Sequence, residues 1–132
     1  MTPWIRAGVS IVVLALACYT IGTALHQREH RVTRRVMRFL LAGLVFDIVA
    51  TACMIMGTQS EGVTLHAVLG FSALAGMLVE TVLAWRHRTA HGEQPVSDRM
   101  AMYSRIAYAY WVIAFISGGM LVAMAARAAR GA

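Results

Sequence analysis

Four long apolar runs constrain this chain more than any other feature of its sequence. They cover residues 8–25, 39–56, 64–85 and 103–125. About 20 apolar residues in a helix cross the hydrocarbon core of a bilayer, whereas a lone extended strand leaves its backbone groups unpaired in lipid. The sequence therefore predicts a single transmembrane domain, residues 1–132, that is all-α and integral to the membrane.

Composition and charge agree with a membrane protein. Apolar residues make up 59% of the chain and charged residues 14%, whereas about a quarter of a soluble domain is charged. The net charge of +6 comes mostly from arginines between the apolar runs. Arginines placed there suit anionic lipid headgroups. We therefore expect the lipid bilayer, and not nucleic acid, as the partner of these charges.

The linkers indicate how the spans are arranged. Short connections between the four runs predict an up-down-up-down four-helix bundle. Linkers 26–38 and 86–102 contain five and three arginines. Arginine-rich linkers stay on the cytoplasmic side of a membrane. We expect a multi-pass protein of a bacterial-type inner membrane, with these two linkers in the cytoplasm and both termini outside.

Two acidic residues interrupt the apolar runs, Asp47 in the second and Glu80 in the third. An ionised carboxylate is costly in hydrocarbon, so such groups usually face the interior of a bundle. Tyr19 and Tyr110 lie at a depth similar to that of the acids, roughly 8–14 Å from the cytoplasmic edge at a rise of about 1.5 Å per residue. Together they predict a proton site, a cation site or a hydrogen-bonding wall for a ligand. The alternative is a pair of neutral acids that only hold the helices together.

Small and polar residues at heptad spacing predict which helix faces meet, because small residues let membrane helices approach closely. The predicted buried faces are Ala15, Tyr19, Gly22 and His26; Gly43, Asp47, Ala50, Met54 and Gly57; His66, Gly70, Ala73, Met77, Glu80 and Ala84; and Ala107, Tyr110, Ala114 and Ser117.

His66, near the outer end of the third run, is the candidate metal ligand. A histidine inside a four-helix membrane bundle is the usual axial ligand of heme b, and a methionine can be the second ligand. Met54 lies at a similar level and is the candidate partner. The alternative is an interfacial histidine that bonds a backbone carbonyl. The other histidines lie in the arginine-rich linkers and are expected to be solvated; they are His26, His30, His87 and His91.

Several short motifs resemble those of the small four-span membrane proteins called the HsmA family. They are Tyr19-Thr20-Ile21-Gly22, Gly43-Leu44-Val45-Phe46-Asp47 with Thr51 and Met54, Leu65-His66-Ala67 with Gly70, and Trp111 with Phe115-Ile116-Ser117-Gly118. The resemblance reaches all four spans but not the linkers. It implies heme binding or sequestration, linked to protection against heme and oxidative stress, and it singles out His66 and Asp47. Glu80 departs from the family pattern, which has a second histidine there.

The first hypothesis is a non-catalytic membrane protein that binds heme within its bundle. Its ligand-binding residues are predicted to be His66, Asp47, Glu80, Tyr19 and Tyr110. The alternative is a proton-coupled small-molecule or ion carrier that uses Asp47 and Glu80, working as a homo-oligomer because four short spans enclose little volume. A third hypothesis is a structural subunit of a membrane complex. No nucleophile elbow, phosphate loop or HExxH motif occurs, so we expect no enzyme.

Overall fold

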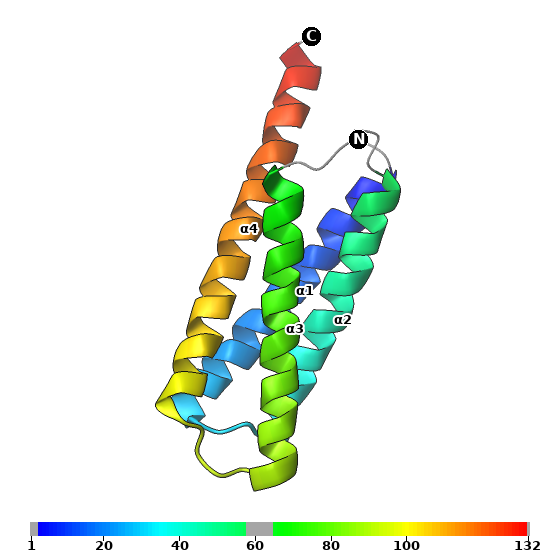
Figure 1. Cartoon of the computed structure of the whole chain (residues 1–132). Coiled ribbons are helices and arrows are strands. Elements are labelled where there is room, and N and C mark those ends of the chain that lie inside the picture. The colour runs from blue at the N-terminus through cyan, green and yellow to red at the C-terminus, as the bar shows by residue number, and fades with distance from the viewer. Residues whose placement is uncertain (1–2, 58–64, 132) are drawn as a thin grey trace.

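The computed structural model describes residues 3–57 and 65–131, which form four helices (Figure 1). They are α1 (Pro3–Glu29), α2 (Arg34–Gly57), α3 (Leu65–His91) and α4 (Asp98–Gly131). No residue within these two ranges belongs to a β-strand. The predicted all-α fold is confirmed, and the described residues of each predicted apolar run lie on one of the four helices.

Three of the helices have the length and apolarity of membrane spans. Within the described residues these stretches are Arg6–Glu29, Arg34–Gly57 and Ala67–His91. A helix of about 20 residues is long enough to cross the hydrocarbon core. The prediction of a membrane protein is therefore supported, while the fourth span, on α4, stays a prediction.

The helices extend beyond the apolar runs, so the predicted linkers 26–38 and 86–102 are too long. The connections that the structure shows are residues 30–33 and 92–97. Arginine is a good helix former, and its long side chain carries the charge away from the apolar surface. The helices therefore continue beyond the apolar runs into the charged segments.

Local chemistry ends and restarts the helices at both connections. His30 (φ 51°) and Gly92 (φ 63°) adopt the left-handed conformation that commonly ends a helix. Each donates its backbone N–H to the carbonyl four residues earlier, at 2.9 and 2.8 Å. The hydroxyls of Thr33 and Ser97 then accept the N–H three residues later, at 3.2 Å in both cases. Hydroxyl N-caps of this kind start α2 and α4.

Consecutive helices run in opposite directions in Figure 1, and the two connections lie at the same end of the bundle. Arg31 and Pro95 form an isolated antiparallel bridge. The backbone N–H of Val96 donates to the carbonyl of His30 at 2.7 Å. We call this end, with connections 30–33 and 92–97, the linker end.

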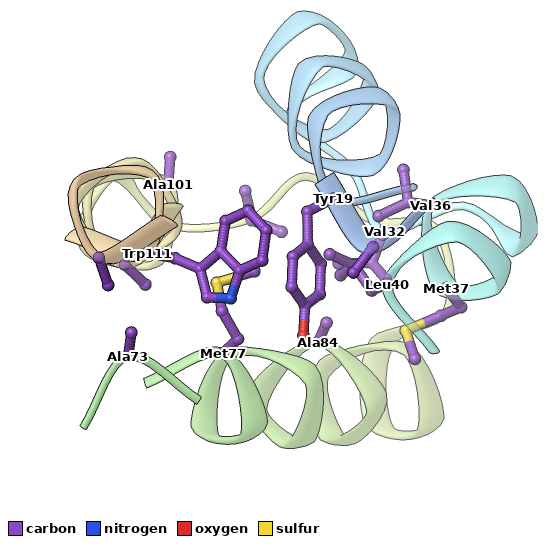
Figure 2. Close-up of a cluster of buried hydrophobic side chains, with 14 residues drawn as sticks. Tyr19, Val32, Val36, Met37, Leu40, Ala73, Met77, Ala84, Ala101 and Trp111 are labelled. Atoms are coloured by element: carbon purple, nitrogen blue, oxygen red, sulfur yellow. The ribbon is translucent and has the colours of Figure 1, made fainter. Parts of the chain in front are cut away.

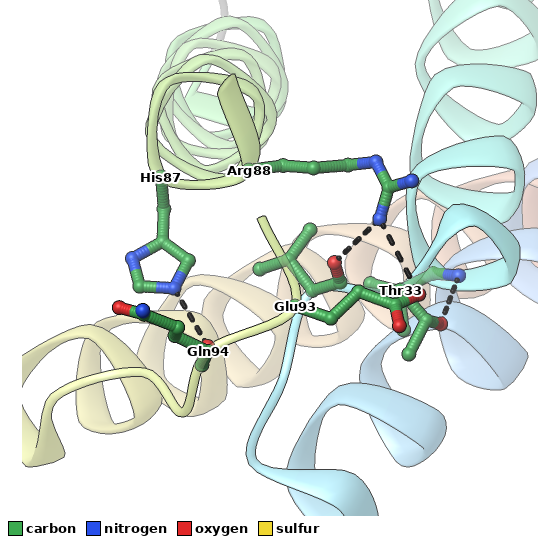
Figure 3. Close-up of polar contacts among 7 residues, drawn as sticks. Thr33, His87, Arg88, Glu93 and Gln94 are labelled. Atoms are coloured by element: carbon green, nitrogen blue, oxygen red, sulfur yellow. Dashed lines mark hydrogen bonds and ion pairs between the residues drawn. The ribbon is translucent and has the colours of Figure 1, made fainter. Parts of the chain in front are cut away.

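The side chain of Arg88 reinforces the linker end (Figure 3). Its Nη1 donates to the carbonyl of Val32 at 3.1 Å and lies 3.6 Å from a carboxylate oxygen of Glu93. On the same helix, Nε2 of His87 lies 3.0 Å from the carbonyl of Gln94. Both interactions join α3 to the connections.

Buried side chains from all four helices fill the bundle (Figure 2). The predicted buried face is confirmed along α1 and, on α3, from Ala73 to Ala84, whereas Gly70 is only half-buried. On α4 the predicted face is rotated from the true one, which is Ala101, Ser104, Ala107, Trp111 and Ala114. The predicted and observed faces have Ala107 and Ala114 in common. Between these two positions, a stripe with steps of three and four residues can pass through either residue 110 or residue 111.

Candidate functional site

Asp47 joins three helices at one carboxylate oxygen. The side chain lies on α2 and is 5% exposed. Its Oδ2 accepts hydrogen bonds from the Tyr19 hydroxyl of α1 at 3.1 Å and from Nε1 of Trp111 of α4 at 2.8 Å. The two donors pack edge to face, with ring centroids 4.9 Å apart and an interplanar angle of 83°. Asp47 is therefore held in place by two hydrogen bonds from two other helices.

Glu80 joins a different set of three helices. It lies on α3 and is 2% exposed. Its Oε1 accepts a hydrogen bond from the hydroxyl of Ser104 on α4. The same hydroxyl oxygen lies 3.2 Å from Nδ1 of His26 on α1. Ser104 and His26 are 0% and 1% exposed, so this chain of three polar side chains is enclosed by the bundle.

Three buried atoms at this second centre lack a hydrogen-bond partner in the part of the chain that the structure describes. They are Oε2 of Glu80, Nε2 of His26 and Oγ1 of Thr23, which lies one turn before His26 on α1. An unsatisfied buried polar group costs about 1–3 kcal/mol, and buried polar atoms are usually satisfied by protein or by water. The Glu80 centre can therefore accept further protons or hydrogen-bonding partners.

Tyr19 connects the two acid centres. Figure 2 shows its hydroxyl pointing across the bundle toward α3, the helix of Glu80. Tyr19 interacts electrostatically with both Asp47 and Glu80. The carboxylates do not share a hydrogen-bond donor, because Asp47 is bound by Tyr19 and Trp111 while Glu80 is bound by Ser104. The two acids thus have different hydrogen-bond donors and different environments.

Tyr110 does not join the other predicted site residues. Its side chain is 37% exposed, and its hydroxyl lies 2.6 Å from that of Ser72 on α3. The buried face of α4 includes Trp111, and the next residue on a helix is turned by about 100°. The expectation that Tyr110 faces the interior is therefore wrong, although its depth was the basis for grouping it with the acids.

Sequence reasoning missed Ser104, and it placed His26 in two ways that conflict. His26 was expected on the buried face of its span, which is confirmed, and also in a solvated linker, which is wrong. It is buried because α1 continues for one turn beyond Leu25, which keeps His26 on the face of Tyr19 seven residues earlier. The spacing of Ser104 is a similar signal: it lies seven residues, about two helical turns, before Trp111 and so shares its buried face of α4.

The described residues do not fit heme at the level of the acids, because the fully buried side chains of Tyr19 and Met77 fill the middle of the bundle there. Met54 is partly exposed, and its side chain lies against Gly8. His66 lies on α3, but its side chain is outside the described part of the chain. Among the residues that are described, no three or more His, Cys, Asp or Glu gather in a metal-binding arrangement.

No protein-family model, curated protein or solved structure matches this chain. The resemblance to the HsmA family, and the heme binding that it implies, stay predictions that rest on the sequence motifs. The buried polar residues of the bundle are the remaining guide to function.

Proposed function

We propose that this chain is a non-catalytic, proton-coupled carrier of small molecules or ions in which Asp47 and Glu80 bind and release protons. The observation that carries the proposal is the burial of both acids, 5% and 2% exposed, with each held by donors from other helices. Ionisable residues inside membrane spans are costly and usually mark ion pathways or proton relays. A carrier accounts for two such acids in one small bundle.

The different surroundings of the two acids favour this function over a purely structural role. A structural contact needs one well-satisfied acid, and Asp47, with two donors on one oxygen, fits that description. Glu80 has a donor on one oxygen, whereas its other oxygen is buried without a partner. Pairs of acids in contrasting environments are typical of sites that move protons, because the two acids then change protonation state under different conditions.

The proposal includes a topology. We assign four antiparallel spans, with α4 crossing over residues 103–125 and the linker end in the cytoplasm of a bacterial-type inner membrane. Both connections lie at that end and adjoin the arginine-rich segments, and the positive-inside rule assigns such an end to the cytoplasm. The termini then lie outside. Four helices packed around a filled core leave little room for a solute, so the solute path is assigned to the contact between copies in a homo-oligomer.

Proton binding is tested on the full chain in lipid vesicles adsorbed to a solid-supported membrane, with pH steps as the probe. Each step should produce a transient current from proton binding, and Asp47→Asn and Glu80→Gln should each reduce it. Glu93→Gln is the matched control, because Glu93 is an exposed acid of the linker end. A wild-type current equal to that of protein-free vesicles would contradict the proposal, as would equal currents in the wild type and both variants.

A further inference from the structure

Ser104 bridges two buried titratable side chains. Its hydroxyl donates to Oε1 of Glu80, while its oxygen lies 3.2 Å from Nδ1 of His26. Each of the three residues comes from a different helix, and none is more than 2% exposed. A hydroxyl placed in this way can accept a proton on one side as it releases one on the other. The three side chains thus form a continuous hydrogen-bonded row across the bundle.

The hydrogen-bonded row can accept one more partner at His26, which lies at the linker end of α1. Nε2 of His26 is buried without a hydrogen-bond partner, and it is the second nitrogen of a ring whose first nitrogen already meets Ser104. His26 lies in the last turn of α1 and interacts electrostatically with His30 and His87. His87 lines an open hollow of about 460 Å³ at the linker end. His26 therefore lies one turn of helix from the linker end, where this hollow is open to solvent.

We propose that His26 and Ser104 form a proton wire that connects Glu80 with the linker end. The inference rests on the proposed function and specifies the side of the bundle that supplies the proton of Glu80. His26 and Ser104 act on Glu80 as positioning and relay residues, whereas Glu80 is the site at which the proton is stored.

One transfer moves one proton and leaves every atom accounted for. His26 in its imidazolium form has protons on both ring nitrogens, and Glu80 begins as a carboxylate. The Nδ1 proton passes to the Ser104 oxygen while the Ser104 hydroxyl proton passes to Oε1 of Glu80. The products are a neutral His26 protonated at Nε2, an unchanged serine and a protonated Glu80. The bare nitrogen of His26 is now Nδ1, so the imidazole ring has to turn over before a proton from the linker end binds it and restores the imidazolium for the next transfer.

Other polar groups near the wire constrain its direction. Tyr19 on α1 and Tyr103 on α4 interact electrostatically with Glu80. The hydroxyl of Tyr103 donates to the carbonyl of Gly76 at 2.9 Å, and that of Tyr19 donates to Asp47, the acid of α2. Both phenols therefore have partners of their own, which leaves the His26 side as the route to the linker end.

The test measures protonation of Glu80 by time-resolved infrared spectroscopy on the full chain in oriented vesicles. The probe is a pH step applied to one face at a time, and the Glu80 carboxyl band is the one lost in Glu80→Gln. Removing either relay residue, by Ser104→Ala or His26→Gln, should slow protonation from the linker end by about tenfold or more, as expected for a lost proton-transfer group. Protonation from the other face should be unchanged.

A matched control and a rescue variant separate the wire from a packing effect. Thr81→Val removes a buried hydroxyl next to Glu80 in the chain, but that hydroxyl bonds the carbonyl of Met77 at 2.8 Å and should have no effect on the rate. Ser104→Thr keeps a hydroxyl and should retain fast protonation. If Ser104→Ala does not fold, the rates of Glu80 protonation from the linker end in His26→Gln and Thr81→Val are compared instead, and a slower rate in His26→Gln alone supports the wire.

The outcomes distinguish the wire from the proposed function. If the wild type shows no Glu80 band that changes with pH, the proposed function fails and the wire fails with it. If the band changes with pH but at the same rate in the wild type and in the relay variants, the wire is overturned while the proposed function stands. Faster wild-type protonation from the face opposite the linker end would also overturn the wire.

Discussion

The aromatic ring of Tyr19 lies directly against Gly43 where α1 meets α2. A Cβ atom added at Gly43 would be 2.5 Å from Cδ1 and 2.7 Å from Cε1 of the ring. Carbon atoms that are not bonded do not approach so closely, since their optimal separation is about 3.5–4.0 Å. Glycine at this position therefore allows the ring to cross the face of α2 and its hydroxyl to reach Asp47, one turn further along.

Gly43→Ala should destabilise the bundle by about 1–3 kcal/mol, the usual cost of overpacking a filled core. The added methyl group forces the Tyr19 ring away from α2 and weakens its hydrogen bond to Asp47. Denaturant titration of the detergent-solubilised protein, followed by circular dichroism, measures the loss. Gly76→Ala is the control, because a Cβ there meets nothing within 4 Å. Equal stability of the two variants would contradict the predicted clash.

Tyr19→Phe and Trp111→Phe each remove one donor to Oδ2 of Asp47. Each variant should lose roughly 0.5–1.5 kcal/mol of unfolding free energy, as for single hydrogen bonds in folded and membrane proteins. A double-mutant cycle should show coupling, because both donors bind the same oxygen. Tyr110→Phe should cost less, since its partner Ser72 also bonds the carbonyl of Leu69 at 3.0 Å. If Tyr110→Phe lost as much unfolding free energy as Tyr19→Phe, the predicted importance of the hydrogen bonds to Asp47 would be contradicted.

Cysteines at positions 31 and 95 should form a disulfide spontaneously under mild oxidation. Arg31 and Pro95 are antiparallel bridge partners, whose typical Cα separation of about 4.5–5.5 Å is within the range that a disulfide spans. The experiment uses Arg31→Cys with Pro95→Cys in a chain without Cys18 and Cys53, and a gel shift reports the cross-link. Arg31→Cys with Glu93→Cys, two residues out of register, should cross-link less. Equal yields from the two pairs would contradict the packing of the connections.

The absorption spectrum separates the carrier proposal from heme binding. A carrier that works through Asp47 and Glu80 needs no pigment, so we expect the purified protein titrated with hemin to show no Soret band that depends on His66. The comparison is between the wild type and His66→Ala, with Met54→Leu for the second predicted ligand. A Soret band that disappears in His66→Ala would instead favour the function that the HsmA resemblance implies.

Some features of the site could be predicted from sequence because they follow from periodicity and from the cost of burying charge. Asp47 and Glu80 interrupt apolar runs, so their inward orientation is predictable, as is that of Tyr19 on a stripe of small residues. Ser104 and Trp111 were not recognised as partners of the acids, because the register of the buried stripe on α4 was misjudged. His26 was assigned to solvent as well as to the core. The charged residues that follow Leu25 gave no sign in the sequence that α1 continues for another turn.

The amino-acid sequence by itself determined that the chain forms helices, where the apolar runs lie, and that two acids must be buried. It did so because the length of an apolar run and the cost of charge in hydrocarbon are properties of each segment alone. Only the tertiary structure decided that Tyr19 and Trp111 share Asp47, that Ser104 lies between Glu80 and His26, and that Tyr110 faces outward. These outcomes depend on how four helices are rotated against one another, which is set by contacts such as Tyr19 on Gly43 between residues far apart in the chain.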